Sequence, residues 1–153
     1  MLKGLHGCAL LPTRHSLLTE EVAVVDPEHL FASVFLWGAG VAFLLVFALP
    51  LFFVPMRWAR VFQWQLPEHT DLAVYLGRCL GGVALAIVVC CFRAAPDPTA
   101  HPLLFELLTL ACALMTFVHI RGAIEGRQPW TETAEIALYG VMTAVALQIR
   151  WGL

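Results

Sequence analysis

The class of fold is decided by residues 31–54, which read FASVFLWGAGVAFLLVFALPLFFV. This stretch has no charged side chain, and its one hydroxyl group belongs to Ser33. A helix rises about 1.5 Å per residue, so a helix over these residues is long enough to cross a hydrocarbon core of about 30 Å. The sequence therefore predicts a transmembrane helix over residues 31–54.

The residues around this stretch predict where the helix starts, bends and ends. Asp26 can cap the helix, Pro27 suits the first helical position, and Glu28 places a negative charge near the positive end of the helix dipole. Pro50 and Pro55 lack the backbone N–H that a continuous helix needs. We expect them to kink and then end the first span.

The composition of the whole chain supports a membrane environment. Of 153 residues, 60% are hydrophobic and 13% are charged, against about 45–50% and about 25% in soluble domains. So few charged side chains cannot cover a soluble protein of this size. The net charge of −2 and nine scattered Lys and Arg residues also form no basic patch, so nucleic acid is not an expected partner. The expected partner is the lipid bilayer.

Three further spans are predicted at about residues 72–92, 103–120 and 133–149, where uncharged cores remain despite some ionisable residues. The connections between spans are short, so consecutive spans should be antiparallel. The predicted fold is an all-α, up-and-down bundle of four transmembrane helices over residues 31–153. Residues 1–30 form a preceding tail that we expect to be amphipathic or partly disordered. The tail is not a convincing signal peptide.

The connection after the first span has its own pattern. On a helix over residues 56–66, one face would carry Trp58, Val61, Phe62 and Gln65. This predicts a short helix that lies in the membrane interface. An ordinary loop with tryptophans anchored at the headgroup level explains the same residues.

Arginine placement predicts the orientation of the spans. Four arginines lie in the first and third connections and two lie close to the membrane on the opposite side. The four are Arg57, Arg60, Arg121 and Arg127, and the two are Arg93 and Arg150. Since positively charged connections favour the cytoplasmic side, both termini are expected outside the cytoplasm.

Neither a redox centre nor a metal site is predicted. The five cysteines include no Cys-x-x-Cys pair, and the six histidines show no His-x-x-His or Glu-x-x-His spacing. Glu132 and Glu135 are spaced i, i+3 and could share a metal with His119. Carboxylates at a helix start more often complement the helix dipole, however. The sequence therefore predicts no metal and no cofactor.

Ionisable residues inside the spans predict a polar centre. A guanidinium two turns into a span, such as that of Arg78, is costly unless it is paired or reaches the interface. The antiparallel order brings the start of the second span, the end of the third and the start of the fourth to one side of the membrane. We therefore expect an Arg78–Glu135 ion pair, open to the side of the first and third connections. The full predicted centre comprises Arg78, Glu135, Glu132, His119, Tyr75 and Tyr139.

Two interpretations of this centre stay open. The ion pair can simply fix the register of the helices. The centre can also be a pocket for a small ligand, an anionic headgroup or a proton. Glu106 lies near the other side of the membrane, where it would reach the interface or pair with Arg93.

Small residues recur every four positions in two spans. Ala73, Gly77 and Gly81 do so in the second span, and Gly140 and Ala144 in the fourth. Such stripes allow close approach of another helix. We expect them to seat neighbours within the chain, and they leave the oligomeric state open.

Several short motifs together resemble the small DoxX-like four-helix bacterial membrane proteins. They are the first span ending in prolines, the Trp-rich stretch to Leu66-Pro67, Leu76-Gly77-Arg78, and Gly126-Arg127-Gln128-Pro129 leading to Glu132 and Glu135. The resemblance covers about residues 31–150, and the tail departs from it. It implies a bacterial inner membrane, accessory roles beside membrane oxidoreductases, and a polar centre whose arginine and acid are Arg78 and Glu135.

Two classes of function follow. The first is a non-enzymatic membrane protein, either an accessory subunit of a larger membrane complex or a binder of lipid or a small hydrophobic ligand. The second is a membrane enzyme or proton-coupled carrier in which Glu135 or His119 exchanges a proton. The sequence shows no specific catalytic set and no convincing inverted repeat, so the first class is favoured.

Overall fold

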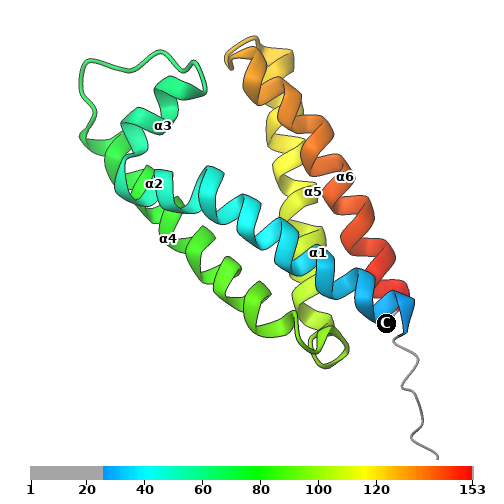
Figure 1. The fold of residues 1–153 in the computed structure, drawn as a ribbon. Helices are drawn as coiled ribbons and strands as arrows, with labels where there is room; N and C mark the ends of the chain where they lie inside the picture. Colours follow the sequence, from blue (N-terminus) through cyan, green and yellow to red (C-terminus); the bar gives the residue numbers. More distant parts are fainter. Residues whose placement is uncertain (1–25, 153) are drawn as a thin grey trace, which may run out of the picture.

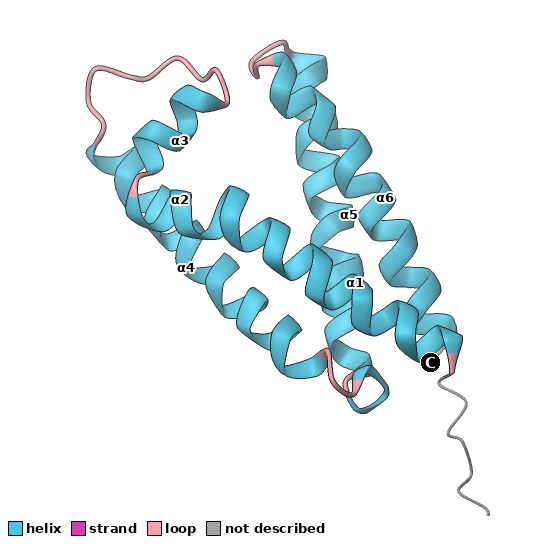
Figure 2. Ribbon diagram, viewed as in Figure 1, coloured by secondary structure: helices cyan, strands magenta, loops and turns pink. Residues whose placement is uncertain are grey.

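The computed structural model describes residues 26–152, and within that range all regular structure is helical, with no strand (Figure 2). The prediction of an all-α chain is thereby confirmed. In chain order the elements are α1 (Pro27–Phe43), the π-helical segment η1 (Leu44–Ala48), α2 (Leu49–Phe53), α3 (Pro55–Val61), α4 (Asp71–Ala94), the 3₁₀ turn η2 (Pro98–Ala100), α5 (Pro102–Glu125) and α6 (Trp130–Gly152).

Three helical segments are long and apolar enough to cross a membrane, judged by length and composition. They are Pro27–Phe53, Asp71–Ala94 and Pro102–Glu125. These segments are the helices of an integral membrane protein, as expected. Helix α6 has a similar length but is less apolar because it contains Glu132, Glu135 and Arg150.

The long helices form two groups (Figure 1). Helix α4 packs against α1, η1, α2 and α3, whereas α5 and α6 form an antiparallel pair along their length. The two groups meet where α1 begins and α6 ends, and they diverge toward the other end. The arrangement is therefore more open at that end than the up-and-down bundle predicted from the short connections.

A small apolar core joins the two groups where they meet. Leu36 of α1 and Phe105 of α5 are both completely buried there. The other buried members of this core are Ala32, Cys91, Ala94, Ala95 and Ile149. Side chains from α1, α4, α5 and α6 thus meet at one end of the molecule.

Helix α1 starts at the cap that its sequence predicts, before the apolar span itself. The Asp26 side chain accepts a hydrogen bond from the Glu28 backbone N–H at 3.1 Å, and Pro27 occupies the first turn. The helix therefore begins four residues before residue 31. Residues 1–25 of the predicted tail lie outside the described range.

Pro50 lies just after a local change in helix type. Residues Leu44–Ala48 are π-helical, and the helix then continues to Phe53. In a regular helix the Val46 carbonyl would accept from residue 50, but proline has no N–H to donate. The Trp58 indole N–H instead donates to the Val46 oxygen at 2.7 Å.

The short helix expected in the first connection is present as α3, over 55–61 rather than 56–66. The rings of Trp58 and Phe62 stack with their centroids 4.3 Å apart. Both rings also lie 5.8 Å from the Phe47 ring. Trp58 and Phe62 therefore pack back against the first span.

The glycine stripe of α4 seats neighbours within the chain, as predicted. A Cβ atom added at Gly77 would lie 2.6 Å from the Pro55 Cβ, and one added at Gly81 would lie 2.8 Å from the Phe52 Cα. A Cβ added at Gly140 would meet nothing within 4 Å. The stripe of α6 therefore packs no described neighbour at Gly140.

Candidate functional site

The site is built by the α5–α6 hairpin. Helix α5 ends at Gly126, whose φ of 63° is a left-handed conformation that glycine adopts without strain. The chain then turns directly into α6. Glu132, Glu135 and Tyr139 are all buried on α6, and their spacing of three and four residues places them on one face.

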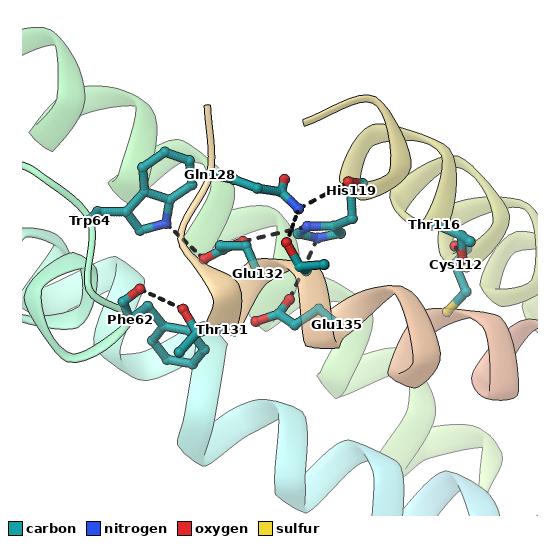
Figure 3. A network of polar contacts seen from close by, with 10 residues as sticks. Phe62, Trp64, Cys112, Thr116, His119, Gln128, Thr131, Glu132 and Glu135 are labelled. Atoms are coloured by element: carbon teal, nitrogen blue, oxygen red, sulfur yellow. Dashed lines mark hydrogen bonds and ion pairs between the residues drawn. The ribbon is translucent and has the colours of Figure 1, made fainter. Parts of the chain in front are cut away.

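His119 of α5 lies between the two buried glutamates (Figure 3). Its Nδ1 atom is 3.5 Å from Glu132 Oε2, and its Nε2 atom is 3.5 Å from Glu135 Oε2. The three side chains are only 7–8% exposed. We call these residues the His–Glu cluster. Its closest N···O separations exceed the usual 2.7–3.2 Å of a hydrogen bond.

Two atoms of the cluster lack a partner. His119 Nε2 and Glu135 Oε1 are buried and have no hydrogen bond within the described structure. An unpaired buried polar group costs about 1–3 kcal/mol, and more when it is charged. These two atoms are therefore free to contact a bound group.

The loop after α3 covers one side of the cluster. The Trp64 indole N–H donates to Glu132 Oε1 at 2.7 Å, which fixes one carboxylate oxygen. The Thr131 hydroxyl donates to the Phe62 backbone oxygen at 2.6 Å. These two bonds connect the loop to the start of α6 (Figure 3).

Tyr139 and Gln128 make further contacts with His119. Its ring stacks on the Tyr139 ring with centroids 5.3 Å apart and an angle of 11° between the planes. Gln128 donates to the His119 backbone oxygen at 3.0 Å and to the Thr133 hydroxyl at 3.1 Å. A Cβ at position 122 would lie 2.9 Å from the Gln128 Cδ, so Gly122 leaves room for this side chain.

The predicted Arg78–Glu135 ion pair does not form, and this prediction is wrong. Arg78 and Tyr75 are both exposed on α4. Helix α4 packs against α1–α3, whereas Glu135 faces α5, where it meets His119. The structure therefore brings together four of the six predicted site residues. These four are His119, Glu132, Glu135 and Tyr139.

Glu106 also has a different partner from the one considered. Its carboxylate accepts from Arg150 of α6 at 2.8 Å, and not from Arg93. This ion pair lies at the end of α5–α6 opposite the His–Glu cluster. The hairpin thus carries a polar contact at each end.

Trp64, Gln128 and Thr131 support the site but were not predicted as part of it. Trp64 lies in the first connection, whose pattern predicted that tryptophans sit at the membrane interface. Gln128 stands in the Gly-Arg-Gln-Pro turn, which marks a loop and not a ligand site. Their roles depend on contacts between segments that are distant in the sequence, as with Trp64 and Glu132, 68 positions apart.

The composition of the cluster determines what it can bind. Two carboxylates and one imidazole make a site with an excess of negative charge, and no arginine or lysine pairs with them in the described part of the chain. Two hollows of about 200 and 470 Å³ lie at the other end of the molecule, and no cluster residue lines them. The cluster therefore suits a small cation better than a bulky ligand.

Comparison of the chain with protein-family models, with curated proteins and with solved structures finds no match.

Proposed function

We propose that this chain is a small, non-enzymatic integral membrane protein that binds a small cationic ligand at the His–Glu cluster. The observation that carries the proposal is the position of His119 between two buried carboxylates, with His119 Nε2 and Glu135 Oε1 left unpaired. A cation in the cluster would balance the charge and satisfy both atoms.

The absence of Arg78 from the centre changes the class of ligand that we propose. With Arg78 paired to Glu135, the centre would be nearly neutral and could accept an anionic headgroup. With Arg78 exposed on α4, the negative charges of the centre are balanced by His119 at most. A cationic ligand is favoured over a lipid headgroup or a hydrophobic molecule.

We further propose the following arrangement in the membrane. Helix α6 pairs with α5 along its length and forms a fourth span, which completes a four-helix membrane domain, while α3 lies in the interface. The arginines near the cluster favour the cytoplasmic side for it, with both termini outside. The resemblance to DoxX-like proteins supports a bacterial inner membrane and an accessory role in a larger membrane complex.

A proton-coupled carrier is the second candidate function. It is favoured by one observation, the proximity of His119 Nε2 and Glu135 Oε2 at 3.5 Å in a buried setting. Such a pair can pass a proton when the local geometry changes. Proton uptake into proteoliposomes, measured with an enclosed pH-sensitive dye, would be lost in E135Q if this candidate is right.

Native mass spectrometry of the protein in mild detergent tests cation binding. We expect a bound mass that wild type retains and E135Q loses, because the substitution removes a charge from the cluster. E125Q is the matched control, since Glu125 also lies on the hairpin but pairs with Arg121 outside the cluster. An equal bound mass in both variants, or none in wild type, would contradict the proposal. A stoichiometric protein that co-purifies would identify the larger complex.

A further inference from the structure

We propose that the ligand of the His–Glu cluster is a divalent transition-metal ion such as Zn²⁺, bound by one atom each from His119, Glu132 and Glu135. This inference rests on the proposed function and specifies its cation. It starts from the arrangement of the three side chains, which come from two helices and are each more than nine-tenths buried.

The distances within the cluster suit ligation. One ligand atom from each residue can be chosen so that all three lie within 4.8 Å of one another. Bonds from zinc to nitrogen and oxygen are about 2.0–2.2 Å, so neighbouring ligand atoms in a tetrahedral site are about 3.4 Å apart. The separation of 3.5 Å between His119 Nε2 and Glu135 Oε2 matches that spacing. Glu132 Oε2 lies 3.5 Å from the other ring nitrogen, Nδ1, so this carboxylate would turn toward Nε2 to share the ion.

The unpaired atoms point to a missing partner. His119 Nε2 and Glu135 Oε1 are ligand atoms of the types that such ions prefer, and they lack hydrogen bonds in the described structure. A small acidic cluster on the surface would satisfy its oxygens with water. Burial separates these atoms from bulk water, so a bound ion would offset the cost of leaving them unpaired.

The surrounding residues resemble the outer shell of a metal site. The Trp64 indole N–H holds Glu132 Oε1, which leaves Oε2 free to turn toward the ion. The Tyr139 ring fixes the plane of the imidazole. Gln128 fixes the backbone at His119. Such outer contacts orient ligands and commonly change metal affinity by about 10–100-fold.

The donor set identifies the class of ion. One imidazole nitrogen and two carboxylates suit Zn²⁺, Mn²⁺ or Fe²⁺. Ca²⁺ takes about six to eight oxygen ligands, and Mg²⁺ requires near-octahedral oxygen coordination, so neither fits three protein ligands that include a nitrogen. Three protein ligands would also leave a coordination position for water or another ligand.

The experiment uses the full chain in detergent, without an affinity tag, after treatment with a chelator. Zn²⁺ binding is measured by equilibrium dialysis and elemental analysis, and Co²⁺ serves as a spectroscopic probe of the ligands. We expect one high-affinity Zn²⁺ per chain, with little competition from Mg²⁺. Loss of at least 100-fold in affinity is expected for H119Q, E132Q and E135Q.

Matched variants outside the cluster serve as controls. E125Q and H101Q remove the same types of side chain at exposed positions and should bind Zn²⁺ like wild type. All variants keep the histidines of residues 1–25, so a site in that segment would be unaffected by the cluster substitutions. W64F should lower the affinity about tenfold or more while the helical circular dichroism spectrum stays unchanged.

Three results would overturn the metal proposal. These are no high-affinity Zn²⁺ in wild type, equal affinity in the cluster variants, or a thiolate-to-cobalt charge-transfer band that assigns the ion to cysteines. The wild-type measurements decide even if a cluster variant fails to fold. If Zn²⁺ does not bind but native mass spectrometry shows an organic cation that E135Q loses, the metal inference fails and the proposed function stands.

Discussion

At the scale of single residues, His119 shows how a polar side chain can be placed inside an apolar helix. It is one of two buried residues on α5, and the other is Phe105 near the opposite end. The other side chains of α5 are exposed or only partly buried. The imidazole is thus directed at α6, where two carboxylates and the Tyr139 ring surround it.

A second residue-scale feature gives a prediction about pH. The Thr99 hydroxyl donates to Asp97 Oδ1 at 2.7 Å in the turn between α4 and α5, and this bond lowers the pKa of Asp97 below its usual 3.8. A lowered pKa stabilises the folded protein above the ordinary value, and the stabilisation is lost as the pH falls through the folded value. We expect T99V to lose this contribution.

The measurement compares thermal unfolding of wild type and T99V in detergent at pH 6 and pH 3. Wild type should lose more stability between the two pH values than T99V does. Because the Asp97 carboxylate is exposed, the difference should be small and should shrink further in high salt. An identical pH dependence would show that the Thr99 hydroxyl does not stabilise the ionised carboxylate.

At the scale of elements, the helices depend on close backbone contacts and on compensation for missing hydrogen bonds. Helix α2 approaches α4 at Gly81 closely enough that a Cβ there would lie 2.8 Å from the Phe52 Cα. The first span changes helix type just before Pro50, which cannot donate a hydrogen bond, and Trp58 supplies a donor from the next helix. Each feature can be tested by a substitution that is compared with a control variant or a control background.

G81A is expected to destabilise the protein by about 1–3 kcal/mol, because the added methyl group meets backbone and not a flexible side chain. G140A is the control, since nothing lies within 4 Å of its added Cβ. Alanine favours helix over glycine by up to about 1 kcal/mol, so G140A should be neutral or stabilising. Chemical unfolding in mixed micelles measures both, and equal effects would argue against the close α2–α4 contact.

A double-mutant cycle tests the link between Pro50 and Trp58. W58F keeps an aromatic ring but removes the donor to the Val46 oxygen, so we expect a loss of about 1 kcal/mol. In a P50A background, the alanine N–H can donate to the same oxygen. W58F should then cost measurably less. Equal costs in both backgrounds would show that the indole bond does not compensate for the proline.

At the scale of the whole molecule, two helical groups are joined by apolar packing at one end and by hydrogen bonds at the other. Phe105 is completely buried in the apolar junction, where α1, α4, α5 and α6 meet. The Trp64–Glu132 and Thr131–Phe62 bonds connect the groups near the His–Glu cluster. The apolar junction should therefore contribute more to global stability.

F105A tests that statement. Removing a buried phenylalanine typically costs about 3–5 kcal/mol, and here the loss should affect both helical groups together. F117A is the control on the same helix, because Phe117 is 62% exposed. Its effect should be below about 1 kcal/mol. Unfolding followed by circular dichroism measures the two variants, and similar losses would contradict the assigned junction.

How much of the molecule could be predicted depends on how far apart in the sequence the contacting residues lie. The long helices could be predicted from their apolar runs and caps. Most of them extend only a few residues beyond the predicted spans. His119 meets Glu132 and Glu135 because a short turn joins antiparallel helices. The sequence predicts this contact, since the three residues lie at similar depths in consecutive spans. The expected partner of Arg78 was wrong because the choice of neighbour for α4 depends on side-chain packing between distant segments.

The indole bond from Trp58 to Val46 also bears on how the chain is made. Its donor lies 12 positions after its acceptor, so the first span emerges from the ribosome before the residue that completes it. A backbone carbonyl without a donor is costly in hydrocarbon. The first span therefore reaches the shape described here only after α3 has followed and Trp58 has folded back onto the Val46 carbonyl.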